Sequence, residues 1–274
     1  MAMLKLGDLA VRDWPLPPGA NTRGTVLLVH GLGEHSARYA ALAHELNRWG
    51  FVVRGYDQYG HGESAGPRGG LPSMNRLLDD LAAVVDDLRS REGDSRRLIL
   101  LGHSMGGLVA SLFVARRLRH VTALVLSSPA LDAGLNPIQQ LLVAVLPRLV
   151  PNLRVSNGLD ASLISHDPAQ VQAYQADPLV HDRIAARLAL FIRDGGPEVI
   201  SAAKGWTVPT LLLYAGEDKL VNPQGSRTFE ALAPAELVES RCFETLYHEL
   251  FNESEPGRSQ VFEALKRWLD QNYL

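Results

Sequence analysis

Residues 97–107 read RLILLGHSMGG, and the fold can be worked out from this stretch. Its first half is an unbroken apolar run, which is typical of a parallel strand that is covered on both faces. Its second half fits G-x-S-x-G, with Ser104 between that strand and a predicted helix. A glycine-rich turn that only packs a helix on a strand would have a similar sequence. The placement favours a nucleophilic serine, because a sharp strand-to-helix turn raises the hydroxyl above the sheet edge.

Similar apolar runs recur along the chain, and segments of helical periodicity separate them. The predicted strands are TVLLVH (25–30), FVVRGYD (51–57), RLILLGH (97–103), TALVLSS (122–128), TLLLYAG (210–216) and ELVESRCF (236–243), with an edge strand within 3–14. The predicted helices cover 36–49, 73–91, 105–119 and 257–272. This alternation predicts an α/β fold with a mostly parallel central sheet and helices on both faces.

Residues 131–205 break the alternation, because prolines separate helical pieces there and no strand is evident. A structureless loop of that length is unusual in a compact domain. We therefore expect a helical cap insertion at 131–205, between a first core part, 1–130, and a second, 206–274. The most apolar part of the cap, 136–153, has two interpretations: a helix that packs on the core, or an acyl-tunnel wall whose outer face touches lipid surfaces.

Composition excludes some classes of function. The chain of 274 residues has a formal net charge of −3 and no dense basic run, which argues against nucleic-acid binding. No phosphate-binding glycine motif and no metal-ligand spacing is evident, so we expect neither cofactor nor metal. The N-terminal segment lacks the apolar core of a signal peptide, and no stretch is long enough to span a bilayer. We expect a cytoplasmic protein, peripheral at membranes if the cap touches lipid, and the oligomeric state is not indicated.

A serine hydroxyl is a weak nucleophile, so a base and an acid should follow it in the order Ser, acid, His. Glu217 and Asp218 come directly after the predicted strand 210–216, and His248 lies between the last strand and the final helix. His248 would take the proton of Ser104 and later give it to the leaving alcohol, while the acid orients the imidazole. Cys242 raises the alternative of a nucleophilic Cys–His pair, but a small, half-buried residue on a late strand is the favoured interpretation.

Five motifs together resemble the monoacylglycerol lipase and lysophospholipase branch of the α/β-hydrolases. They are HGLGEHSARY (30–39), DQYGHGES (57–64), GHSMGG (102–107), AGEDKLVN (215–222) and YHELFNE (247–253). The resemblance implies the α/β-hydrolase fold, Asp218 as the acid and His248 as the base. It also implies an oxyanion hole that is formed by the N–H groups of Leu32 and Met105.

Other polar residues near these motifs have two interpretations. By the resemblance, Glu34 and Arg38 form a polar end of the pocket that binds the free hydroxyls of glycerol; alternatively, they form a structural ion pair that secures the loop. His103 is expected to point away from the nucleophile. His30, Asp57 and His61 are expected to tie loops to backbone groups, as polar side chains in crowded turns commonly do.

The sequence therefore predicts a serine ester hydrolase that cleaves monoacylglycerols or similar single-chain lipid esters through an acyl-enzyme on Ser104. A general carboxylesterase, a thioesterase or a lysophospholipase with the same triad is the alternative among enzymes. A ligand-binding relative without turnover is the alternative outside them, although it would have no need of Ser104, Asp218 and His248 together.

Overall fold

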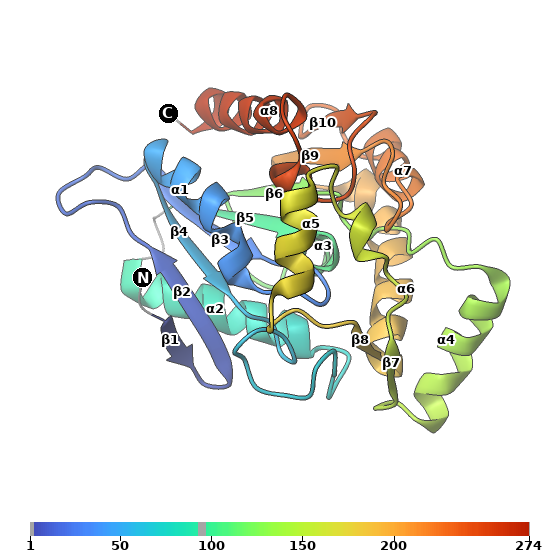
Figure 1. Ribbon diagram of the computed structural model, residues 1–274. Helices are drawn as coiled ribbons and strands as arrows, with labels where there is room; N and C mark the ends of the chain where they lie inside the picture. The colour runs from blue at the N-terminus through green and yellow to red at the C-terminus, as the bar shows by residue number, and fades with distance from the viewer. Residues whose placement is uncertain (1–2, 93–96, 274) are drawn as a thin grey trace.

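The computed structural model describes residues 3–92 and 97–273 and has an eight-stranded sheet at its centre (Figure 1). The strands lie in the order β1-β2-β4-β3-β5-β6-β9-β10. Neighbours from β4 to β10 are parallel, whereas β2 is antiparallel to both β1 and β4. The predicted mostly parallel sheet is confirmed. Its strands are β1 (Met3–Leu6), β2 (Leu9–Trp14), β3 (Gly24–Val29), β4 (Phe51–Tyr56), β5 (Leu98–His103), β6 (Ala123–Ser127), β9 (Thr210–Ala215) and β10 (Val238–Phe243).

Helices cover both faces of the sheet (Figure 1). On one face, α1 and α8 pack against Val26 and Leu28 of β3. On the other, α2, α3, α6 and α7 share a core with Leu27 and Val29 of the same strand. Successive residues of β3 thus enter two separate cores, which explains why its sequence does not alternate. The helices are α1 (Ala40–Arg48), α2 (Arg76–Glu92), α3 (Met105–Ala115), α4 (Pro137–Leu149), α5 (Pro168–Ala176), α6 (Ala186–Ala202), α7 (Gln224–Leu232) and α8 (Gly257–Asn272), with short 3₁₀ turns η1 (Ser36–Tyr39), η2 (Ala161–Leu163), η3 (Ala203–Gly205) and η4 (Leu250–Asn252).

Some elements differ from those predicted. The segment 3–14 forms two strands rather than one, because Gly7 reverses the chain with a φ of 56°, which glycine adopts easily. The helix after Ser104 ends at Ala115 rather than at 119, because Arg117 has a φ of 52° that a right-handed helix does not continue. α7 lies outside the predicted helices. It has only 9 residues, and Phe229 is its one large side chain that is buried, so few apolar residues mark it in the sequence.

The insertion lies between β6 and β9 and includes two strands that the sequence does not reveal. β7 (Arg154–Ser156) and β8 (Arg183–Ala185) form a short antiparallel ribbon, too short to produce a periodic signal. α6 packs against α3 and buries Leu188 and Phe191 in the core, so this part of the insertion belongs to the helical layer. In contrast, α4 projects from the body of the molecule, and none of its side chains is buried (Figure 1).

Among residues 3–92 and 97–273, no helix has both the length and the apolar character needed to cross a membrane.

Candidate active site

Ser104 occupies the turn between β5 and α3 in a backbone conformation that few residues adopt. Its φ of 54° and ψ of −122° are strained, and such strain is common at catalytic turns. The turn lies close against β3, since a Cβ on Gly106 would come within 2.1 Å of the carbonyl oxygen of Val29. The end of β6 holds the turn on both sides. The N–H of Ser104 donates to the carbonyl of Ser127 at 3.0 Å, and the N–H of Ala130 donates to the carbonyl of Ser104 at 3.0 Å.

His248 and Asp218 are paired. Nδ1 of His248 lies 2.6 Å from Oδ2 of Asp218, and the two side chains are 7% and 3% exposed. The other oxygen of Asp218 accepts the backbone N–H groups of Leu220 and Val221, each at 2.9 Å. Glu217, the other carboxylate of this loop, is 51% exposed. The structure therefore brings Asp218, and not Glu217, to the imidazole.

Burial and charge act in opposite directions on this pair. Burial disfavours the imidazolium, but the charge and hydrogen bond of Asp218, together with the charges of Glu249 and Glu34, outweigh burial and raise the pKa of His248. Burial likewise favours the neutral form of Asp218, yet His248 and the two backbone N–H groups lower the pKa of Asp218. The pair is thus suited to holding a proton on the imidazole during acyl transfer.

A cavity of about 470 Å³ opens at Ser104. Its lining includes His248, Leu32 and Met105, so these predicted residues meet at one place. From the apolar stretch 136–153, Val143 contributes to the wall. Most of the remaining wall is apolar and comes from later parts of the insertion, including Leu159, Ile164, Val180, Ile184 and Ile192.

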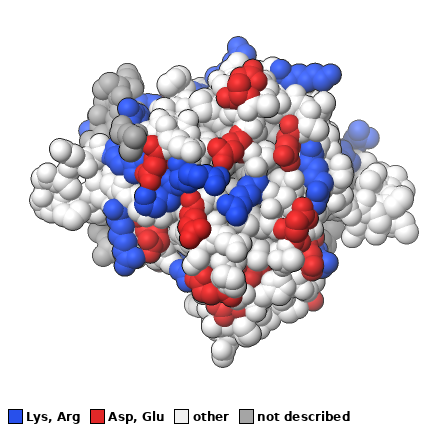
Figure 2. Space-filling model, turned by 90° about the horizontal axis from the view of Figure 1, so that it is seen from above, with Lys and Arg blue, Asp and Glu red and all other residues white. Residues whose placement is uncertain are grey.

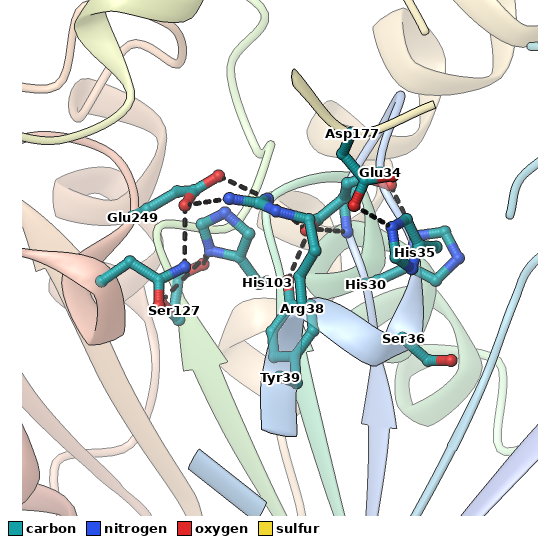
Figure 3. A network of polar contacts seen from close by, with 12 residues as sticks. His30, Glu34, His35, Ser36, Arg38, Tyr39, His103, Ser127, Asp177 and Glu249 are labelled. Carbon is teal, nitrogen blue, oxygen red and sulfur yellow. Dashed lines mark hydrogen bonds and ion pairs between the residues drawn. The ribbon is translucent and has the colours of Figure 1, made fainter. Parts of the chain in front are cut away.

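Glu34 lines this cavity, and Arg38 lies between Glu34 and Glu249 (Figure 3). The carboxylate of Glu34 accepts the N–H of Gly31 at 2.7 Å, the hydroxyl of Tyr39 at 2.6 Å and Nη1 of Arg38 at 2.6 Å. Burial raises the pKa of Glu34, but the charge of Arg38 and smaller contributions lower it to about 2. The ion pair expected as the structural alternative is present, and Glu34 faces the cavity as well.

The insertion directly contacts residues 30–34, the turn in which the sequence predicts an oxyanion donor and which we call the oxyanion turn. The N–H of His181 donates to the carbonyl of Gly33 at 2.9 Å, and the carboxylate of Asp177 lies 2.8 Å from Nε2 of His35. Gly33 has a φ of 79°, and a Cβ at this position would lie 2.4 Å from the carbonyl oxygen of His181. Glycine is therefore required where the cap approaches the turn.

Three residues that line the cavity were missed or misplaced by the sequence analysis: His103, Tyr174 and Glu249. The prediction that His103 points away from Ser104 is wrong, because His103 lines the same cavity as Ser104 and its ring centroid lies 4.7 Å from that of His248. Burial, with a contribution from His248, lowers the pKa of His103 to about 4. Glu249 directly follows His248, and this position could have marked it as a residue of the site. Nothing in the sequence marks Tyr174, whose ring lies 4.6 Å from the guanidinium of Arg38.

The expectation for the other polar loop residues is confirmed. Asp57 accepts the backbone N–H groups of Ser36 and Glu63 at 2.9 and 2.8 Å. Nε2 of His30 accepts a backbone N–H at 2.9 Å, and Nδ1 of His61 lies 3.0 Å from a backbone carbonyl. These contacts fix the loops that flank the oxyanion turn.

Residues 20–255 match the family described as serine aminopeptidase, S33. The chain belongs to this family. The monoacylglycerol lipase of Mycolicibacterium smegmatis is 34% identical over 255 residues, covering 92% of this chain and 90% of that protein. Human monoglyceride lipase is 30% identical over 269 residues, covering 96% and 87%. The crystal structure of a Paleococcus ferrophilus monoacylglycerol lipase superposes with a TM-score of 0.86 at 34% identity, covering 97% of this chain and 100% of that chain.

Membership of the family and the likeness of the structures confirm the α/β-hydrolase fold and the resemblance seen in the motifs. The relatives are lipases and esterases, so at the level of the family the chain is a member of the lipase and esterase group of α/β-hydrolases.

Proposed function

We propose that this protein is a serine carboxylic ester hydrolase that cleaves monoacylglycerols or similar single-chain lipid esters. The observation that carries the proposal is the cavity at Ser104, which combines an ionised side chain, Glu34, with a largely apolar wall from the insertion. A glycerol ester with one acyl chain has the same combination of a polar and an apolar end. The relatives named monoacylglycerol lipase support this substrate class.

The proposed reaction is acyl transfer in two steps. The hydroxyl of Ser104 attacks the ester carbonyl while His248 accepts its proton, and His248 then protonates the leaving alcohol. Asp218 holds the imidazole in the required tautomer and stabilises its charged form. The N–H groups of Leu32 and Met105 donate to the oxyanion. Water then releases the fatty acid from Ser104 by the same route.

In this proposal Glu34 accepts hydrogen bonds from the free hydroxyls of glycerol. A carboxylate has about four acceptor positions, and Glu34 already receives donors from Gly31, Arg38 and Tyr39. Arg38 keeps Glu34 ionised and oriented, so it serves the same polar end. The apolar wall receives one acyl chain and leaves little room for a second.

We expect monoacylglycerol to be cleaved much faster than di- or triacylglycerol. We also expect kcat/KM to rise with acyl length until the wall is covered, because each buried methylene contributes about 0.8 kcal/mol, roughly fourfold in rate. Initial rates on mono-, di- and triacylglycerols, lysophospholipid and p-nitrophenyl esters of increasing length measure this. Equal rates on triacylglycerol, or a strict preference for acetyl esters, would contradict the proposed substrate.

We also propose that the projecting segment 136–159, which includes α4, contacts lipid surfaces. Its apolar side chains are exposed, with Ile138 at 72% and Leu149 at 73%. The others are Leu141, Leu142, Val145, Val150, Leu153, Val155 and Leu159. Figure 2 shows few charged side chains on the edge that projects on the right, where Figure 1 places α4, and also on the edge that projects on the left, whereas the middle of this face mixes both signs. Apolar side chains on a projecting edge can enter the lipid boundary without unfolding the core.

Replacement of Leu141 and Leu149 by Gln should weaken binding to phosphatidylcholine vesicles by roughly 10²-fold, because burial of each leucine in the lipid contributes about 1.5 kcal/mol of binding free energy. Co-sedimentation with vesicles measures the change. Hydrolysis of a water-soluble short ester should stay unchanged. The matched control replaces Met3 and Leu4, which are exposed apolar residues on β1. Equal vesicle binding by the α4 variant and the wild type would refute this contact.

A further inference from the structure

A buried salt bridge joins the oxyanion turn to the loop that carries His248 (Figure 3). Arg38 donates from Nη1 to Glu34 at 2.6 Å and, as a fork, from Nη1 and Nη2 to the two carboxylate oxygens of Glu249, each at 2.7 Å. The side chains of Arg38, Glu34 and Glu249 are 10%, 4% and 7% exposed. A forked arginine fixes its partners in orientation as well as in distance, and burial protects the contact from screening by salt.

Each end of this bridge lies close in the chain to a group that acts in the proposed reaction. Glu34 accepts the N–H of Gly31, which directly precedes Leu32, the proposed oxyanion donor. Glu249 directly follows His248, the proposed base. The contacts therefore run without a break from the oxyanion donor to the base.

We propose that Arg38 and Glu249 form a positioning bridge that keeps the imidazole of His248 in register with the oxyanion turn. Proton transfer from the Ser104 oxygen and stabilisation of the oxyanion then take place around the same tetrahedral carbon. This inference rests on the roles given to His248 and Leu32 in the proposed function. Arg38 acts through its two carboxylate partners and does not contact the substrate. A misplacement of about 1 Å at a reacting group costs roughly 10²-fold in rate, so the bridge affects kcat.

The bridge also contributes to the charge around His248. The side chains that face this region are Asp218 after β9, His103 of β5, Glu34 and Arg38 of the oxyanion turn and η1, Tyr174 of α5, and Glu249. Burial lowers the pKa of His248, Asp218 raises it, and Glu249 and Glu34 raise it further. Loss of the Glu249 charge should therefore lower the pKa of His248 and move the acid limb of the rate profile to lower pH.

Two substitutions test the bridge. Arg38→Lys keeps a positive charge but removes the fork, and Glu249→Gln keeps the shape but removes the negative charge. The first readout is the rate at which a fluorophosphonate probe labels Ser104, which depends on the base and the oxyanion hole but needs no lipid substrate. The second is kcat and KM on a p-nitrophenyl ester and on monoacylglycerol. If Glu249→Gln does not fold, Glu249→Asp withdraws the carboxylate by one methylene and provides the test.

The matched control is Asp13→Asn, which breaks a second fork, from Arg54 at 2.6 and 2.8 Å, between β2 and β4 and away from the cavity. The side chain of Arg54 is 4% exposed, as little as those of the bridge, whereas that of Asp13 is 31% exposed. This variant reports what the loss of a carboxylate from a buried arginine does to stability alone. Its unfolding midpoint should fall while its pH profile and labelling rate stay at the wild-type values.

We expect Arg38→Lys and Glu249→Gln each to lower the labelling rate and kcat by roughly 10- to 10²-fold. For Glu249→Gln the loss should be equal on both esters, with KM little changed. Arg38→Lys also loosens Glu34, so its loss should appear on both esters and be larger on monoacylglycerol. The double variant should lose no more than the worse single variant, because both residues act through one bridge. Glu249→Gln should also shift the acid limb to lower pH. Additive losses, an unshifted pH profile, or a loss confined to monoacylglycerol would overturn the bridge. Wild-type protein that labels at Ser104 without cleaving monoacylglycerol would overturn the proposed substrate and not the bridge.

Discussion

Purified Ser104→Ala protein should lose ester turnover by roughly 10⁴-fold or more. The substitution removes only the attacking oxygen, and neither backbone hydrogen bond that holds the turn involves the side chain. The unfolding midpoint should therefore change little, and the backbone strain at this position remains. Initial rates on a p-nitrophenyl ester, together with thermal melts, measure both effects.

The matched control for this substitution is Ser111→Ala. Ser111 is a fully buried serine of α3, and its hydroxyl donates to the carbonyl of Gly107 at 2.7 Å. The control should keep its activity, because that hydroxyl bonds to the backbone of its own helix. If Ser104→Ala kept more than a few per cent of wild-type turnover, the nucleophile would have to be sought elsewhere.

Asp218→Asn should lower kcat by roughly 10⁴-fold, since an amide holds the imidazole in the wrong tautomer and does not stabilise its charged form. Glu217→Gln should change kcat by less than about twofold, because an exposed side chain contributes little; Glu217 is 51% exposed and lies 4.0 Å from Lys219. The two variants alter neighbouring carboxylates of one loop, so each serves as the control for the other.

The two carboxylates can also be told apart by pH. Asp218 raises the pKa of His248, so the residual activity of Asp218→Asn should have its acid limb at lower pH than the wild type. Glu217→Gln should leave the limb in place. The opposite ranking of the two variants in kcat would transfer the acid role to Glu217.

The part of the site that stands on the sheet could be predicted because its signals are local. An apolar strand, a glycine-flanked serine and a helix follow one another around Ser104, and strand ends place the acid and His248 on loops at one edge. The choice of Asp218 over Glu217 depended on the resemblance between motifs. The structure makes the same choice by distance, at 2.6 Å from the imidazole.

The position of the insertion in the sequence could be predicted, but its internal structure could not. Its two short strands contact the rest of the fold; for example, the N–H of Ala185 donates to the carbonyl of Gly69 at 2.8 Å. Such contacts, and not a hydrophobic pattern within the strands, place the ribbon. The fork between Arg38 and Glu249 joins residues 211 positions apart. Sequence patterns report on neighbours along the chain, so a contact over that distance leaves no such signal.

The place where the insertion leaves the sheet has a consequence for how such enzymes diversify. The chain departs from β6 and returns in β9, its parallel neighbour, and two parallel neighbours need a crossover in any case. α6 supplies the packed part of that crossover, and added length ahead of it costs little more in closure entropy as it grows. Descendants of this fold can therefore exchange the stretch before α6, and with it the compounds that reach Ser104, while the sheet and the loops that carry Ser104, Asp218 and His248 are inherited unchanged.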